Sequence, residues 1–377
     1  MSRPEIQPPT SQTPELQCMG TVPFSAKESK ITPYVYHVLV TEHGIAATAS
    51  KHEVKLFDAS RLEPLHTVGY HDNTITQIRA RDQHLVVTSS KDQAVSAWDL
   101  RIRPAQAVLR IKLSLPILTF DISGDSNVLA TGSEWSSHES KIELIDFRST
   151  KPLHEFTMSH SDDITCVNFS PFAPTQLLSA STDGLLSIFD VTKSEEDEAL
   201  IGSANINASV SQANYFGPGS EYIFSMTDME TLALWNAELT PIVDFGDMRV
   251  MDQQGFELDY MINGRYSAQS DRFYVTMGSD YGDIHVLNVQ LGRIEVAWVM
   301  KDGHSEIVRD VDWDDSRGYA VSGSEDGNIT LWRAAVDLAA SYPAAATTTR
   351  GEGSTPKSQP SGPGATAGGK HTRFSPY

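Results

Sequence analysis

Short stretches in which apolar and polar residues alternate recur along this chain. Each ends on a bulky apolar residue followed by one polar residue, usually Asp or Asn. Alternation with a period of two residues is the pattern of a β-strand. The seven stretches are residues 53–58, 94–99, 141–146, 185–190, 231–236, 283–288 and 328–333. The successive bulky residues lie 41, 47, 44, 46, 52 and 45 positions apart. A strand-rich repeat of this length predicts a seven-bladed β-propeller.

Turn residues divide each repeat into further strands. In the fourth repeat, the alternation at 163–169 is followed by Pro171, which cannot continue a ladder of hydrogen bonds. A second strand at 176–181 then leads through Asp183 and Gly184, which predict a tight turn, into the third strand. The same division along the chain predicts blades at about 33–68, 73–111, 115–158, 162–204, 208–245, 258–300 and 305–333.

The two ends of the chain differ in composition from the repeats. Residues 1–14 are polar and rich in Pro, and residues 334–377 are dominated by Ala, Thr, Ser, Gly and Pro. Such segments lack the apolar residues that offset the entropy of ordering a chain, so both are predicted to be disordered tails. This leaves residues 15–333 as one propeller domain.

The last eight residues, KHTRFSPY, are basic and aromatic. Residues 334–377 carry a net charge of +2, which leaves −22 on the rest of the chain. Arg373, Phe374 and Tyr377 form a candidate binding motif, because aromatic and Arg side chains are frequent anchors at protein interfaces. An acidic and partly apolar groove would suit this motif, either on a partner or on the propeller itself. The alternative is an end of the chain that has no binding role.

The overall charge of −20 argues against direct binding to nucleic acid, where affinity comes from Lys and Arg residues that neutralise phosphates. Two isolated cysteines, Cys18 and Cys166, provide neither a disulfide framework nor a zinc motif and indicate a reducing compartment. The sequence contains no signal peptide pattern and no apolar run long enough for a membrane span. We therefore expect an intracellular protein that binds neither membranes nor nucleic acid.

Nucleotide-binding and hydrolase motifs are missing from the sequence. The 12 histidines are scattered without the spacing of metal ligands. We therefore expect no catalytic residue, no cofactor and no metal.

Three repeats resemble those of the WD-repeat family. They are TSSKDQAVSAWD at 88–99, SASTDGLLSIFD at 179–190 and SGSEDGNITLWR at 322–333. The resemblance implies an all-β propeller of seven four-stranded blades. In that family the N-terminal segment usually supplies the outer strand of the last blade, and residues 17–24 hold the matching position. Closure of the ring in this way leaves no open sheet edge.

The resemblance also implies a hydrogen-bonded tetrad of His, Ser or Thr, Asp and Trp within a blade. One tetrad comprises His71, Thr88, Asp92 and Trp98, and a second comprises His304, Ser322, Asp326 and Trp332. A partial tetrad comprises His160, Ser179, Asp183 and Phe189. Ser, His and Asp together resemble a hydrolase triad, so an enzyme on a propeller scaffold is one alternative. Recurrence in several blades favours a structural role, because an active site is needed only once.

Members of the family usually bind partners on one face of the ring. The residues expected on that face are Tyr70, Asp72, Asp162, Asp163, Ser305 and Glu306. We predict a non-catalytic scaffold for protein–protein interactions, which acts as a monomeric propeller within a larger nuclear complex. The sequence does not identify its protein partners.

A W-D-x-R motif provides a second alternative function. The motif spans Trp98 to Arg101, and the residues from Ile145 to Arg148 form a weaker copy. In some WD-repeat proteins this motif docks the propeller adaptor of a cullin-type ubiquitin ligase, and the chain would then be a substrate receptor. Arg101 and Arg148 would be the docking residues, with Arg101 as a charge-assisted hydrogen-bond donor. The other reading of Arg101 is a local salt bridge.

Overall fold

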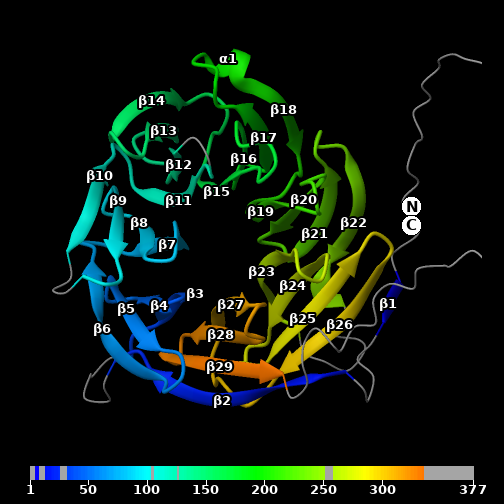
Figure 1. Ribbon diagram of the computed structural model, residues 1–377. Helices are drawn as coiled ribbons and strands as arrows, with labels where there is room; N and C mark the ends of the chain where they lie inside the picture. Colours follow the sequence, from blue (N-terminus) through cyan, green and yellow to red (C-terminus); the bar gives the residue numbers. More distant parts are fainter. Residues whose placement is uncertain are drawn as a thin grey trace, which may run out of the picture.

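The computed structural model describes residues 5–7, 13–25, 32–102, 106–124, 127–250 and 258–334. Strands wind around a central axis into a ring of seven blades (Figure 1). One α-helix is present in the described residues, the four-residue α1 (Glu196–Ala199). The predicted all-β, seven-bladed propeller is confirmed.

Each of the first five blades is a separate four-stranded antiparallel sheet built from consecutive strands, whereas the strands of blades 6 and 7 belong to one nine-stranded sheet. Blades 1 to 3 contain β3 (Val35–Thr41), β4 (Gly44–Ala49), β5 (Glu53–Asp58), β6 (Glu63–Tyr70), β7 (Ile75–Ala80), β8 (Leu85–Ser90), β9 (Ala94–Asp99), β10 (Ala107–Lys112), β11 (Ile117–Ile122), β12 (Val128–Ser133), β13 (Ile142–Asp146) and β14 (Lys151–Phe156). Blades 4 to 6 contain β15 (Ile164–Phe169), β16 (Gln176–Ser181), β17 (Leu185–Asp190), β18 (Leu200–Asn205), β19 (Val210–Phe216), β20 (Tyr222–Thr227), β21 (Thr231–Asn236), β22 (Pro241–Asp247), β23 (Tyr260–Ser267), β24 (Arg272–Gly278), β25 (Ile284–Gln290) and β26 (Arg293–Met300). Blade 7 contains β27 (Val308–Asp314), β28 (Tyr319–Ser324), β29 (Asn328–Ala334) and β2 (Glu15–Pro23).

The hydrophobic core lies between neighbouring blades, because each sheet is covered on both faces. One apolar cluster joins Val87 and Val95 of blade 2 to Phe120, Leu129 and Ile145 of blade 3. The second and third strands of a blade are therefore buried along most of their length, as in β8 and β9.

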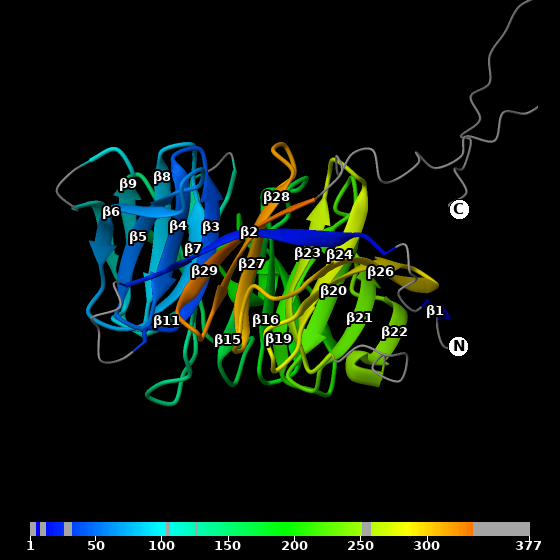
Figure 2. The same cartoon turned by 90° about the horizontal axis from the view of Figure 1, so that it is seen from below.

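The N-terminal strand β2 closes the ring as predicted. It runs antiparallel to β29, with Cys18 opposite Trp332 and Pro23 opposite Asn328. Leu16 and Phe24, at or beside its two ends, are almost completely buried. Viewed from the side, β2 crosses the outside of the ring toward blade 6 (Figure 2), where its first residues pair in parallel with β26.

A second N-terminal strand, β1 (Glu5–Gln7), differs from the prediction that residues 1–14 are a disordered tail. It pairs in parallel with β26, and Glu5 lies opposite Arg293. The strand contains only three residues, Glu-Ile-Gln, which are too few to predict a strand from alternation. The outer edge of β26 supplies free backbone partners, and β1 covers part of this edge. Residues 335–377 of the predicted C-terminal tail lie outside the described residues.

Side chains of the innermost strands connect neighbouring blades around the centre. Gln77 of blade 2 accepts a hydrogen bond of 2.7 Å from the Phe120 N–H of blade 3. Between blades 7 and 1, Asp310 accepts from the Val38 N–H at 3.1 Å and Asp312 from the Val40 N–H at 2.7 Å. Burial raises the pKa of both carboxyl groups to about 6.

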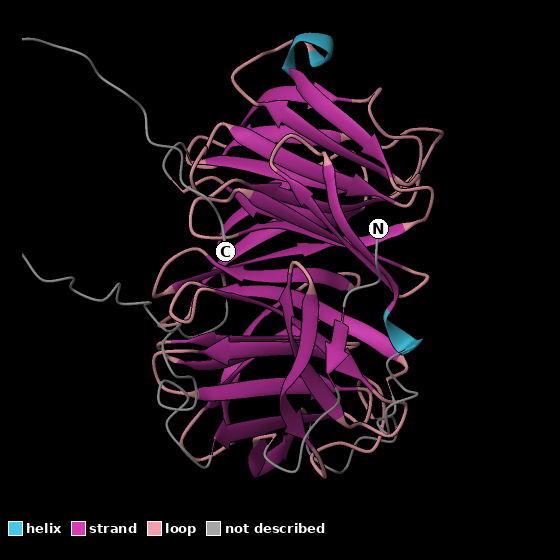
Figure 3. Cartoon of the chain, turned by 90° about the vertical axis from the view of Figure 1, so that its right-hand side faces the viewer, coloured by secondary structure: helices cyan, strands magenta, loops and turns pink. Residues whose placement is uncertain are grey.

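The loops gather on the two faces of the ring (Figure 3). Within the part of the chain that the structure describes, no helix combines the length and apolar character needed to cross a membrane. The face that carries the loops leading into each first strand, together with the tight turns between second and third strands, is called the turn face below.

Candidate functional site

The four predicted residues of blade 2 lie within hydrogen-bonding distance of one another. His71 Nδ1 is 2.9 Å from Asp92 Oδ2, and His71 Nε2 is 2.8 Å from Thr88 Oγ1. The indole N–H of Trp98 donates to the same Thr88 oxygen at 2.8 Å. Burial opposes ionisation of Asp92, but hydrogen bonds from His71 and from the Asp72 N–H outweigh it and hold its pKa well below the usual range.

Blade 7 repeats the arrangement with a serine. His304 Nδ1 lies 3.1 Å from Asp326 Oδ2, and His304 Nε2 lies 2.6 Å from Ser322 Oγ. Trp332 donates its indole N–H to Ser322 at 2.7 Å. Asp326 also accepts the backbone N–H groups of Ser305 and Asn328, so the network fixes both the loop before the blade and the tight turn within it.

Blade 4 holds the partial set. His160 Nδ1 is 3.2 Å from Asp183 Oδ2, and His160 Nε2 is 2.7 Å from Ser179 Oγ. Phe189 takes the position of Trp and instead stacks on Phe156, with ring centroids 5.0 Å apart. Apolar stacking there replaces the hydrogen bond that an indole would donate.

A related contact in blade 5 was missed from the sequence. Trp235 donates its indole N–H to Ser225 Oγ at 2.9 Å, without the His and Asp of the other networks. A hydroxyl residue ten positions before Trp is common to Thr88, Ser322 and Ser225, so this spacing alone could have identified it.

These networks are arranged to hold turns. The hydroxyl groups of Thr88, Ser179 and Ser322 are completely buried and already bonded, so a substrate cannot reach them. The described residues contain no group of three or more His, Cys, Asp or Glu side chains that could hold a metal ion.

The turn face is held together by backbone hydrogen bonds between each tight turn and the loop that leads into the same blade. The N–H groups of Lys91, Thr182 and Glu325 donate to carbonyl oxygens of those loops at 2.9–3.0 Å. The side chains predicted for a partner face lie on this rigid frame. Tyr70, Asp72, Asp162, Ser305 and Glu306 are exposed, and Asp163 is half-buried.

Large apolar side chains are also exposed on the turn face. They are Tyr34, Tyr70, Trp135, Met158, Met229, Val250 and Tyr281. Loops of the opposite face expose Ile102, Phe172 and Leu291. Asp163 Oδ1 accepts the Trp135 N–H at 2.6 Å and so links the long turn of blade 3 to blade 4. The turn face therefore combines exposed apolar groups with carboxylates.

The two arginines of the W-D-x-R motif and its copy lie in loops between third and fourth strands, away from the turn face. The Arg101 guanidinium forms two hydrogen bonds with Asp99, at 2.9 and 2.6 Å, and the Arg101 side chain remains 56% exposed. It borders a hollow of about 300 Å³ that Asp82 and His84 also line. Arg148 is exposed, and its backbone N–H donates to Asp146.

The acidic run at residues 195–198 contributes an unpredicted contact. Glu196 of α1 accepts the N–H groups of Thr157 and Met158 at 2.7 and 3.0 Å and also bonds the Ser159 hydroxyl. One carboxylate thus fixes the loop that carries the exposed Met158. The predicted tail motif at Arg373, Phe374 and Tyr377 lies outside the described residues.

Comparison with known proteins gives the same class of protein as the geometry. The family model "WD domain, G-beta repeat" matches residues 150–190 and 298–333, which cover the third strands of blades 4 and 7. The structure thus shows a closed β-propeller of seven blades, with matches to the WD repeat in blades 4 and 7.

Three relatives bear on its function. The chain is 26% identical over 306 residues to WD repeat-containing protein 89 homolog of Dictyostelium discoideum, covering 80% of this chain and 83% of the relative. It is 23% identical to DDB1- and CUL4-associated factor 11 homolog of Caenorhabditis briggsae, over 56% of this chain and 42% of the relative. It is also 23% identical to nuclear pore complex protein nup43 of Dictyostelium discoideum, over 42% of this chain and 38% of the relative.

Proposed function

We propose that this protein is a non-catalytic scaffold that binds protein partners through its turn face. The observation that carries the proposal is the set of exposed apolar side chains on that face, distributed around the ring from Tyr34 to Tyr281. Exposed aromatic groups on a rigid frame are the usual anchors of protein interfaces. The buried hydroxyl groups of the tetrads support the non-catalytic part of the proposal.

The experiment compares two exposed aromatic residues on opposite faces. Tyr281 is 72% exposed on the turn face, and Phe172 is 66% exposed on the other face. Each is replaced by Ala, and partners are recovered by affinity purification and identified by mass spectrometry. Tyr281→Ala is expected to lose partners that Phe172→Ala retains. Recovery of the same partners from both variants would contradict the proposal.

We also propose that the scaffold works in a nuclear complex, as a single propeller. Support comes from the relative named as a nuclear pore complex protein and from the overall charge of −20, which favours basic protein partners over nucleic acid. Fluorescence microscopy of the tagged chain, with light scattering of the purified protein, tests both parts. A cytoplasmic protein, or a homodimer in solution, would rule out the corresponding part.

A second candidate function is a substrate receptor of a cullin-type ubiquitin ligase. It is supported by the exposed Arg101 beside a hollow and by the relative named as a DDB1- and CUL4-associated factor. Arg101→Ala should then abolish co-purification of the ligase adaptor, with Arg148→Ala as the comparison for the weaker copy. A wild-type chain that never recovers the adaptor would eliminate this candidate.

A further inference from the structure

The third strand of every blade has one position whose side chain faces the preceding blade, midway between the tight turn and the bulky residue. The residues there are Lys55, Ser96, Glu143, Ser187, Ala233, His285 and Thr330. Small residues are the commonest, since space between blades is limited. Glu143 is the one carboxylate in this set, and the other six blades serve as internal comparisons.

Glu143 lies in a mostly apolar setting with incomplete hydrogen bonding. Its Oε2 atom is buried and has no hydrogen-bond partner among the described residues. Burial raises the pKa of its carboxyl group, and the carboxylate of Glu155, directly opposite on β14, adds to this shift. Lys141 and a hydrogen bond with the Ser114 side chain oppose the shift. A buried carboxylate oxygen without a partner is costly, and a bound cation would remove that cost.

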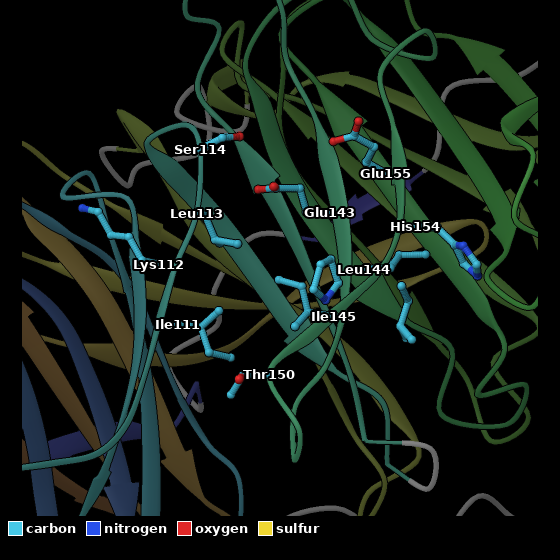
Figure 4. Close-up of a pocket in the computed structure, with 12 residues that line it drawn as sticks. Ile111, Lys112, Leu113, Ser114, Glu143, Leu144, Ile145, Thr150, His154 and Glu155 are labelled. Atoms are coloured by element: carbon cyan, nitrogen blue, oxygen red, sulfur yellow. The ribbon is translucent and has the colours of Figure 1, made fainter.

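The Glu143 carboxylate lines a groove of about 300 Å³ between blade 2 and blade 3 (Figure 4). The groove is bounded on one side by the end of β10 and on the other by β13 and β14. Its apolar walls are formed by Ile111, Leu113, Leu144, Ile145, Pro152 and Leu153. Leu153 is 44% exposed, so part of the apolar surface is open to solvent.

The cations near the groove are already engaged. Lys141 Nζ lies 3.4 Å from Glu139 and 3.5 Å from Glu155. Lys112 donates from Nζ to the carbonyl oxygen of Asp92. The groove therefore offers a carboxylate between apolar walls, which suits a Lys or Arg side chain, because its apolar stem packs while its charged head pairs.

We propose that this groove binds the basic and aromatic end of the chain itself, residues 370–377, with Lys370 or Arg373 beside Glu143 and an aromatic ring against the apolar wall. Two facts favour this occupant. The segment is positively charged, whereas residues 1–333 carry −22. The 35 residues between Ala334 and Lys370 can span at most about 125 Å, whereas a propeller of this size has a radius of gyration of about 19 Å.

The test places a photoreactive benzoylphenylalanine at position 374 of the full-length chain. After irradiation, the cross-linked sites are mapped by mass spectrometry, and the yield is measured at several protein concentrations. We expect cross-links to β10 and β14, near Leu113 or Leu153, with a yield that does not depend on concentration. Cross-links elsewhere, no cross-links, or a yield that rises with concentration would overturn binding of the chain's own end.

Matched variants separate the groove from general charge attraction. Glu143→Gln should lower the cross-link yield about tenfold, the size of effect expected for a lost charged hydrogen bond. Glu238→Gln removes the same charge from an exposed loop of the opposite face, between β21 and β22, and should leave the yield unchanged. Leu153→Lys, which adds a cation at the open side of the groove, should also lower it. An undiminished yield in Glu143→Gln, with wild-type melting behaviour, would refute the role of Glu143.

Discussion

Blade 7 and blade 3 share one architecture but are stabilised differently. In blade 7, Trp332 and His304 both bond Ser322, which ties the third strand, the second strand and the preceding loop together. In blade 3, Thr131 holds the equivalent position, but Ile145 replaces Trp and packs into the apolar cluster with blade 2. A blade can thus be stabilised by a local hydrogen-bond network or by apolar packing. The two differ in how strongly they constrain the turn between the second and third strands.

The turns of the two blades show this difference. Asp326 fixes a three-residue turn in blade 7, through its bond from the Asn328 N–H. Blade 3 has no such carboxylate, and its turn extends through Trp135 and a bridge between Ser136 and Glu139. Of these two blades, blade 3, which lacks the tetrad, presents the exposed Trp135 and the Glu143 groove.

The largest effect is expected from removal of residues 1–26. Blade 7 would lose β2 and the buried side chains of Leu16, Val22 and Phe24. Burial of such side chains is worth about 1.5–3 kcal/mol each, so the sum is comparable to the whole stability of a typical domain. Thermal melting of the truncated chain should show a strongly destabilised or unfolded protein. Removal of residues 1–13 alone, which takes away β1 but keeps β2, should cost far less, and equal melting of the two truncations would contradict the closure by β2.

The next effect separates a complete network from a partial one. Asp326→Ala leaves His304 and two backbone N–H groups without their acceptor, with an expected cost of about 1–3 kcal/mol in the free energy of unfolding. Asp183→Ala should cost less, because Phe189 already leaves Ser179 without an indole donor. Denaturant titration of both variants gives the comparison, and equal losses would show that Trp332 does not strengthen the network.

A smaller effect concerns pH at the junction of blades 7 and 1. Burial raises the pKa of Asp312 from its usual value of 3.8 to about 6, so the folded state binds the proton more tightly than the unfolded state. Its contribution to stability is therefore full below pH 4 and is lost as pH rises through 6, by about 1 kcal/mol between pH 5 and pH 7. His37 stays neutral in this window, because burial lowers its pKa to about 4.

Asp312→Asn keeps an acceptor for the Val40 N–H and removes the titration. Unfolding free energies of the variant and the wild type at pH 5, 6 and 7 provide the measurement. The variant should lose less stability than the wild type as the pH rises. Parallel pH profiles would mean that Asp312 does not titrate in this range.

The smallest effect is expected for a carboxylate–cation pair outside the core. Arg101→Ala removes two hydrogen bonds to Asp99, yet exposed ion pairs contribute little because water solvates both partners. The free energy of unfolding should change by less than about 0.5 kcal/mol. A loss as large as that of Asp326→Ala, measured under the same conditions, would show that the loop after Trp98 depends on this pair.

Local sequence signals were sufficient for the ring, whereas the residues of the tetrads and the closing strand were predicted from the resemblance to WD repeats. Trp332 follows Asp326 and Gly327 at a short fixed distance, and the structure brings it to Ser322, ten positions earlier. Turn residues and alternation act within one repeat, so they can be read without knowledge of the neighbouring blades. The closing strand was recognised by its position relative to the last repeat.

Contacts between repeats could not be predicted in this way. Glu196 looks like part of a solvated acidic run, but it bonds Thr157 in the preceding repeat. Glu143 occupies a polar position of an alternating stretch, which usually indicates solvent. In a propeller that side of the third strand faces the preceding blade, so Glu143 is half-buried. β1 was missed because its partner, the edge of β26, is nearly 290 residues away.

Closure of the ring by β2 has a consequence for synthesis of the protein on the ribosome. β2 leaves the ribosome roughly 300 residues before its antiparallel partner β29. At about 5–20 residues per second, the nascent chain keeps one strand of its final sheet without that partner for roughly 15–60 seconds. The early blades can fold during this interval, but the apolar residues of β2 have no permanent place until β29 has emerged. Attachment of a chaperone to β2 is therefore expected in this interval, and its release should follow the emergence of β29.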